Sequence, residues 1–133
     1  MNAKRIEVRW ADLDGFGHVH HPTFLTYLEE GRDAWLRRLF GLEPGELWYY
    51  LVARVAIDYR GDLRAPEALV DCSVERIGNS SLTTREQVRS PDDRLLAEAE
   101  VVIVAIDGRG GRPRPLSDAE RALLERERAE GSA

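Results

Sequence analysis

One stretch near the N-terminus, from Trp10 to Phe24, contains the side chains best suited to chemistry. It includes two carboxylates, Asp12 and Asp14, and all three histidines of the chain. Its two glycines indicate a turn, and Pro22 suits the first turn of a helix, where a missing N–H costs nothing. We therefore interpret this stretch as an active-site loop that leads into a helix.

Asp14 is the strongest candidate for a catalytic group. It lies between a strand pattern and the expected helix start, so its carboxylate can stand near free backbone N–H groups. Such groups carry partial positive charge and stabilise an oxyanion. A carboxylate beside an oxyanion site is the minimum for hydrolysing an activated acyl group, as nucleophile or as general base. From spacing alone, a plain Asx turn beside Gly15 is favoured for Asp14, and a structural or capping role is favoured for Asp12.

The three histidines invite a metal interpretation, which their spacing does not favour. His18, His20 and His21 do not converge on one ion from a regular element, and no Cys/His cluster exists elsewhere. We therefore expect neither a metal nor a cofactor. His18 and His20 are instead candidate substrate contacts, one of them as a general acid near Asp14, and solvent-facing loop histidines are the alternative.

Several arginines lie on or beside the expected strands and could bind the phosphates of a nucleotide-bearing substrate. They are Arg54, Arg60, Arg64 and Arg76, followed by Arg109, Arg112 and Arg114 in a later loop. Arg60 is the one that we select as a candidate, and an ordinary solvated face is the alternative for each. Neither a Walker nor a dinucleotide-binding glycine pattern is present.

The elements that must position these residues follow from hydrophobic periodicity. Alternation predicts a first strand over Arg5–Trp10, and a helical pattern runs from Pro22 to Gly41. Four further strands are expected at Val52–Arg60, Ala68–Ile77, Ser81–Val88 and Leu95–Ile106. The run Ser117-Asp-Ala-Glu120 matches a capping box and predicts a short charged helix to about Arg128. This order predicts an α+β fold, with one helix against a single curved sheet.

Composition limits the class of protein. A chain of 133 residues with 43% hydrophobic residues is long enough for one domain with a real core. The net charge of −5 argues against nucleic acid as a partner. The single cysteine, Cys72, excludes an internal disulfide and fits a reducing compartment. Neither a signal core near Met1 nor an apolar run of about 20 residues is found, so we expect a cytoplasmic protein with no membrane partner.

The segment Val8–Arg32 resembles the opening of the 4-hydroxybenzoyl-CoA thioesterase-like hotdog family. The shared pattern is an aspartate, a small turn, Gly-His-Val, and a helix ending in Glu-Glu-Gly-Arg. The runs Val74–Thr83 and Leu96–Val101 are also similar to this family, and the resemblance extends over about Ile6 to Pro115. It implies a hotdog fold, a long central helix wrapped by a curved antiparallel sheet of about five strands. Residues 1–115 would form this single domain, and 116–133 a short charged helix and tail.

The resemblance also implies site residues. Asp14 matches the family's catalytic aspartate, and His21 matches the residue whose backbone N–H polarises the thioester carbonyl. Gly17 matches the turn glycine that permits the approach. Ser80 and Ser81 fall where the family contacts the pantetheine arm of its substrate.

The implied activity is hydrolysis of an acyl-CoA or aroyl-CoA thioester by a homodimer or homotetramer, with the substrate at the dimer interface. Two alternatives stay open. One is a hotdog protein that binds acyl-CoA or acyl-carrier protein without turnover. The other is a dehydratase that acts on a hydroxyacyl thioester.

Overall fold

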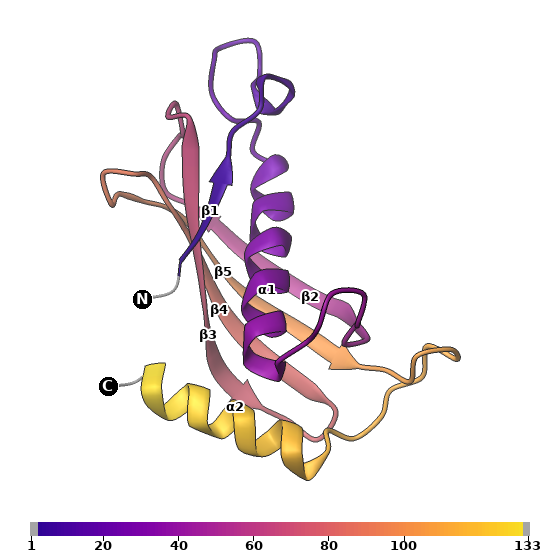
Figure 1. Ribbon diagram of the computed structural model, residues 1–133. Helices are drawn as coiled ribbons and strands as arrows, with labels where there is room; N and C mark the ends of the chain where they lie inside the picture. The colour runs from indigo at the N-terminus through magenta and orange to yellow at the C-terminus, as the bar shows by residue number, and fades with distance from the viewer. Residues whose placement is uncertain (1–2, 132–133) are drawn as a thin grey trace. The chain divides into compact units, whose positions relative to one another are not determined.

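The computed structural model describes residues 3–131 and contains five strands and two α-helices (Figure 1). In chain order the elements are β1 (Lys4–Glu7), a 3₁₀ turn η1 (Trp10–Asp12), α1 (Thr23–Phe40), β2 (Tyr50–Tyr59), β3 (Glu67–Ile77), β4 (Ser81–Arg89), β5 (Leu95–Ala105) and α2 (Asp118–Gly131). The strands form one sheet in the order β1-β3-β4-β5-β2. The predicted α+β fold with about five strands is confirmed. Residues 132 and 133 of the predicted tail lie outside the described residues.

The first strand is shorter than predicted. β1 ends at Glu7, and Trp10 begins the η1 turn instead of closing a strand over Arg5–Trp10. The cause is local, because the Asp12 carboxylate accepts a hydrogen bond from the Arg9 N–H at 2.9 Å and closes the turn. The Trp10 side chain is 89% exposed, so its place in the alternating pattern did not indicate burial.

The strand predicted over Val52–Arg60 is present as β2, but it is not half-buried as alternation suggests. Eight of its ten residues are exposed, and the other two are of intermediate exposure, so side chains on both faces of the strand reach solvent. The reason is its position, because β2 is the end strand of the sheet order. Alternation alone therefore identified the strand without showing what covers it.

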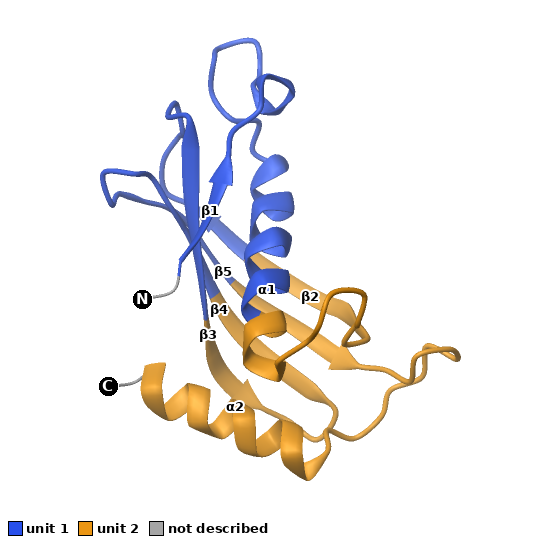
Figure 2. Ribbon diagram, in the orientation of Figure 1, with its two compact units in different colours: residues 1–35, 57–72, 86–99 blue, residues 36–56, 73–85, 100–133 orange. Residues whose placement is uncertain are grey.

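The described chain divides into two compact units, which Figure 2 colours separately. Unit 1 contains the N-terminal residues to Trp35 together with 57–72 and 86–99. Unit 2 contains 36–56, 73–85 and the residues from Glu100 onward. Within residues 3–131, no helix is both long and apolar enough to cross a membrane.

In unit 1, the first part of α1 packs on β3 and β4 through contacts that fix its register. A Cβ atom on Gly31 would lie 2.3 Å from Cγ1 of Val70, so only glycine fits there. The next residue, Arg32, donates hydrogen bonds from Nε and Nη2 to the Glu86 carboxylate at 2.8 and 3.0 Å. Both side chains are buried, at 4% and 0% exposure, so the pair compensates charge that water does not reach.

In unit 2, α2 begins at the predicted capping box. The Ser117 N–H donates to Glu120 Oε1 at 2.7 Å, and the Glu120 N–H donates to Ser117 Oγ at 3.1 Å. The same carboxylate accepts hydrogen bonds from both Nη atoms of Arg114 and from the indole N–H of Trp48. The Arg114 hydrogen bonds outweigh burial and lower the pKa of Glu120 to about 2. The helix start is therefore held by an ion pair that persists to acidic pH.

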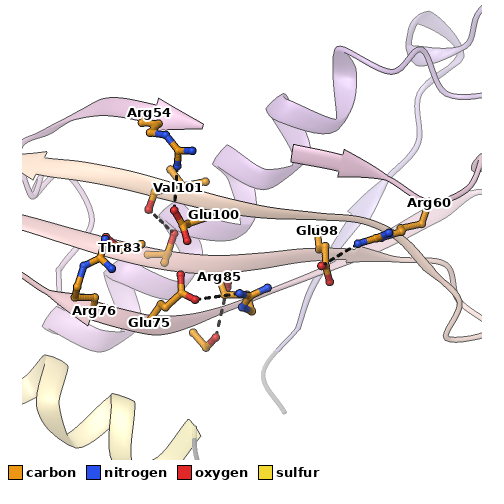
Figure 3. Close-up of polar contacts among 11 residues, drawn as sticks. Arg54, Arg60, Glu75, Arg76, Thr83, Arg85, Glu98, Glu100 and Val101 are labelled. Atoms are coloured by element: carbon orange, nitrogen blue, oxygen red, sulfur yellow. Dashed lines mark hydrogen bonds and ion pairs between the residues drawn. The ribbon is translucent and has the colours of Figure 1, made fainter. Parts of the chain in front are cut away.

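Ion pairs between neighbouring strands are shown in Figure 3. In unit 2, Arg54 on β2 donates to Glu100 on β5 at 2.9 Å, and Arg85 donates to Glu75 at 3.0 Å. In unit 1, Arg60 lies next to Glu98, with Nη2 3.3 Å from Oε1. These arginines are about half exposed, so each pair contributes little to stability.

Candidate active site

The loop before α1 is closed by backbone hydrogen bonds between its two halves. The His20 N–H donates to the Asp12 carbonyl at 2.8 Å, and the Asp14 N–H donates to the His18 carbonyl at 2.7 Å. The chain turns at Gly17, whose φ of +81° is a conformation that side-chain-bearing residues rarely adopt. Gly17 therefore shapes the turn, and its predicted role in admitting the substrate stays a prediction.

The Asp14 carboxylate forms the Asx turn that spacing suggested. Its Oδ1 accepts hydrogen bonds from the N–H groups of Phe16 at 2.8 Å and His18 at 3.1 Å. The Phe16 hydrogen bond, helped by that of His18, outweighs burial and lowers the pKa of Asp14 below its usual range. Among the described residues, nothing donates a hydrogen bond to Oδ2. The hydrogen bonds to Oδ1 thus favour the charged form of the carboxylate, while Oδ2 stays available.

A cavity of about 430 Å³ in unit 1 brings four of the predicted site residues together. They are Asp14, His18, His21 and Arg60, and the other lining residues are Val19, Phe24, Tyr59, Gly61 and Asp62. The loop and the start of α1 form one side of this lining, and the end of β2 with the following residues forms the other.

His21 lies two residues before the start of α1. Its carbonyl accepts hydrogen bonds from the Phe24 N–H at 3.1 Å and from the Tyr59 hydroxyl at 3.2 Å. Its ring packs edge-on against the ring of Tyr59, with centroids 5.5 Å apart. Within residues 3–131, no atom accepts a hydrogen bond from the His21 N–H. A helix start with an unpaired N–H attracts negative charge.

His18 and Asp62 are neighbours in the cavity wall. Nε2 of His18 is buried and lies 3.2 Å from Oδ2 of Asp62, without the geometry of a hydrogen bond. Arg64 donates to the same Asp62 oxygen at 3.2 Å, and this contact lowers the pKa of Asp62. His18 therefore lines the cavity with its Nε2 turned toward Asp62. No group of three or more His, Cys, Asp or Glu side chains suited to a metal occurs among the described residues.

Three predicted substrate contacts do not line this cavity. His20 is exposed, and its ring centroid is 5.3 Å from that of His21. Ser80 and Ser81 belong to unit 2, at the turn between β3 and β4, where their carbonyls accept hydrogen bonds from Ala105 and Gly78. The roles predicted for these three residues stay predictions.

Tyr59 and Asp62 are cavity residues that the sequence interpretation did not select. Both flank Arg60, which it did select, in the run Asp58-Tyr-Arg-Gly-Asp that ends the second predicted strand. A cluster of polar side chains at a strand end was the available signal. Their partners, however, lie 38 and 44 residues earlier in the loop before α1, and no local pattern indicates such a contact.

Fold and site together define a class of protein. A loop carboxylate and the start of a long helix line one cavity, on an α+β sheet in which the strand after the helix is an end strand. This arrangement is that of a hotdog enzyme. A family model described as the thioesterase-like superfamily matches residues 8–124. The chain belongs to this superfamily, and it is a thioester hydrolase by class.

Individual relatives match most of the chain. The acyl-CoA thioester hydrolase YbgC of Escherichia coli O157:H7 is 24% identical over 115 residues, covering 84% of this chain and 86% of the relative. The uncharacterized protein YsmA of Bacillus subtilis is 25% identical over 121 residues, which cover 90% of this chain and 82% of YsmA.

Solved structures match the fold over almost the whole chain. A thioesterase of Thermus thermophilus, in complex with coenzyme A and zinc, has a TM-score of 0.82 and 32% identity. The match covers 96% of this chain and 94% of that one. The PA5185 protein of Pseudomonas aeruginosa has a TM-score of 0.83 and 25% identity, with 96% and 91% covered. The predicted hotdog fold is confirmed.

Proposed function

We propose that this protein hydrolyses acyl-CoA thioesters, including aroyl-CoA, in the cavity between Asp14 and the start of α1. The observation that carries the proposal is the pairing of an ionised carboxylate having one unbonded oxygen with the unpaired N–H of His21. Both residues line the same cavity. The acyl-CoA activity of YbgC and the coenzyme A bound to the Thermus thermophilus thioesterase support this substrate class.

The proposed reaction begins when the thioester carbonyl oxygen accepts a hydrogen bond from the His21 N–H. Negative charge grows on that oxygen as the carbonyl is attacked, and the helix start stabilises it. In one route Oδ2 of Asp14 attacks and expels the CoA thiolate, giving an anhydride that water then hydrolyses. In the other route Asp14 takes a proton from the water that attacks, and this proton leaves on the CoA sulfur. Both routes give a carboxylic acid and free CoA.

We propose His18 and Arg60 as substrate contacts within the cavity, and His20, Ser80 and Ser81 as further contacts outside it. The Arg60 guanidinium forms ion pairs with two carboxylates, its Nη2 lying 3.3 Å from Oε1 of Glu98 and 4.0 Å from Oδ2 of Asp58. Its charge is thus partly neutralised, which weakens any contact with the CoA phosphates.

We also propose that the protein is a homodimer, with a homotetramer as the larger assembly. The support is the exposed end strand β2, which carries Leu51, Val52 and Val55 at 54%, 45% and 38% exposure. An unpaired strand edge with apolar side chains is a surface that another chain can cover. The single half-buried cysteine supports a cytoplasmic location.

Thiol release from a panel of acyl-CoA and aroyl-CoA thioesters tests the proposed function. We expect Asp14→Asn to lower kcat by at least about a hundredfold with a small change in KM, because the carboxylate acts in the transition state. The matched control is Asp93→Asn, which makes the same change at an 85% exposed carboxylate outside the cavity and should keep kcat.

Other outcomes identify the alternatives. Near-normal turnover by the Asp14→Asn variant would overturn the mechanism. Binding of acyl-CoA by the wild-type protein without thiol release would favour a binding protein. An unsaturated product with the thioester intact would indicate a dehydratase.

A further inference from the structure

A buried hydrogen bond connects α1 to the base of the active-site loop. The Tyr27 hydroxyl donates to Oδ2 of Asp12 at 2.7 Å. Tyr27 is 0% exposed and Asp12 is 5% exposed, so the contact is shielded from water. Oδ2 also accepts the Arg9 N–H at 2.9 Å, and Oδ1 lies 3.4 Å from Nη2 of Arg9. Neither Tyr27 nor Asp12 lines the cavity, so the proposed reaction does not use this pair directly.

The charge states of Tyr27 and Asp12 favour this hydrogen bond around neutral pH. Burial by itself raises the pKa of Asp12, but hydrogen bonds from Arg9 and Tyr27 outweigh it and hold the pKa below its usual range. Burial and the neighbouring Asp12 carboxylate raise the pKa of Tyr27. Around neutral pH the carboxylate is therefore an acceptor and the hydroxyl a donor, which gives a strong charge-assisted hydrogen bond.

Asp12 lies at one end of the loop and bonds to the other end. Its backbone carbonyl accepts the His20 N–H at 2.8 Å, so it closes the loop next to His21. Asp14 is two residues further along the chain from Asp12. A displacement of Asp12 would therefore move the proposed catalytic carboxylate and the proposed oxyanion donor relative to each other. The Tyr27 hydroxyl is the contact that ties this closing residue to the helix.

We propose that Tyr27 is a positioning residue, which acts through Asp12 to hold Asp14 and the His21 N–H in their reactive arrangement. This inference rests on the proposed function. Small displacements of reacting groups cost large factors in rate, while substrate affinity depends on many other contacts. Loss of the hydroxyl should therefore appear in kcat and hardly in KM.

The test is Tyr27→Phe, which removes one oxygen and keeps the ring. We expect kcat for the best acyl-CoA to fall about tenfold, with KM changed by less than about twofold. Asp12→Asn, in which the neutral amide has one oxygen to share between two donors, should change kcat in the same direction. Faster hydrogen exchange at the amides of His18 and His20 should accompany both changes.

The matched control is Thr84→Val, which removes another fully buried hydroxyl in unit 2, where it donates to the Val101 carbonyl. It should lower the unfolding temperature by a similar amount and leave kcat unchanged. A Tyr27→Phe variant with wild-type kcat in an active enzyme would overturn this inference alone. Equal losses of kcat in Tyr27→Phe and Thr84→Val would also overturn it, since the effect would be one of stability. A wild-type protein inactive on every thioester would overturn the proposed function and this inference together.

Discussion

The Asp14 carboxylate uses its two oxygens for different purposes. Oδ1 closes an Asx turn with two backbone N–H groups, and Oδ2 carries no hydrogen bond from the described residues. The structural and catalytic interpretations of Asp14, which are alternatives when only spacing is considered, are therefore compatible. The turn even prepares the chemistry, because hydrogen bonds to a carboxylate favour its charged form.

The pH dependence of turnover tests this view of Asp14. Its pKa is lowered by the Phe16 and His18 hydrogen bonds, and the charged carboxylate is the reactive form. Ionisation is complete above the lowered pKa, so activity due to Asp14 is lost only when the pH falls through that value. We expect kcat to show no acid limb between about pH 5 and pH 7. An acid limb near pH 6 that disappears in an Asp14 variant would contradict the assignment.

The unpaired N–H of the site belongs to His21, two residues before α1. The middle of α1 is fixed in register by Gly31 against Val70 and by the buried Arg32–Glu86 pair. Because both contacts lie in unit 1 with the cavity, the helix start and the cavity share one packing arrangement.

The Arg32–Glu86 pair gives a prediction about stability. Glu86→Gln removes the charge that the buried Arg32 guanidinium contacts through two hydrogen bonds, and we expect a loss of about 3–5 kcal/mol in the free energy of unfolding. The control is Glu67→Gln, which breaks an ion pair whose Arg5 partner is 70% exposed and should cost less than about 1 kcal/mol. Urea denaturation of both variants measures the difference. Equal, small losses would show that the buried pair does not stabilise unit 1.

At the scale of the whole molecule, the end strand β2 exposes apolar side chains that a monomer would leave in contact with water. Soluble chains protect an edge strand with charge or bury it against a partner. Here the residues of β2 include several exposed apolar side chains, and the proposed homodimer would cover them.

Sedimentation velocity tests the dimer. We expect the wild-type protein to sediment at about twice the chain mass of 15.1 kDa, or at four times that mass as a tetramer. Val55→Lys should shift the mass toward the monomer, because a lysine on an edge strand disfavours pairing. Val55→Thr, which keeps the branched shape, should leave the mass unchanged. A wild-type protein that is monomeric at micromolar concentration would contradict the proposed assembly.

The sequence by itself determined the features that depend on residues a few positions apart. The capping box of Ser117 and Glu120 and the turn at Asp14 were predictable because their hydrogen bonds span two to four residues. Strand alternation located four strands and a helical period located α1, since both report which side of an element is apolar. The family resemblance added the fold and the role expected for Asp14.

Only the tertiary structure decided which distant residues meet. The contacts of Tyr59 with His21, of His18 with Asp62 and of Tyr27 with Asp12 join positions between 15 and 44 residues apart. The exposure of Trp10 was likewise settled by the fold, because a strand-like alternation is the same whether or not anything covers it. Local hydrogen bonds are encoded in spacing, whereas burial depends on every element that packs nearby. For this reason the sequence identified the candidate carboxylate, and the structure identified the residues that surround and hold it.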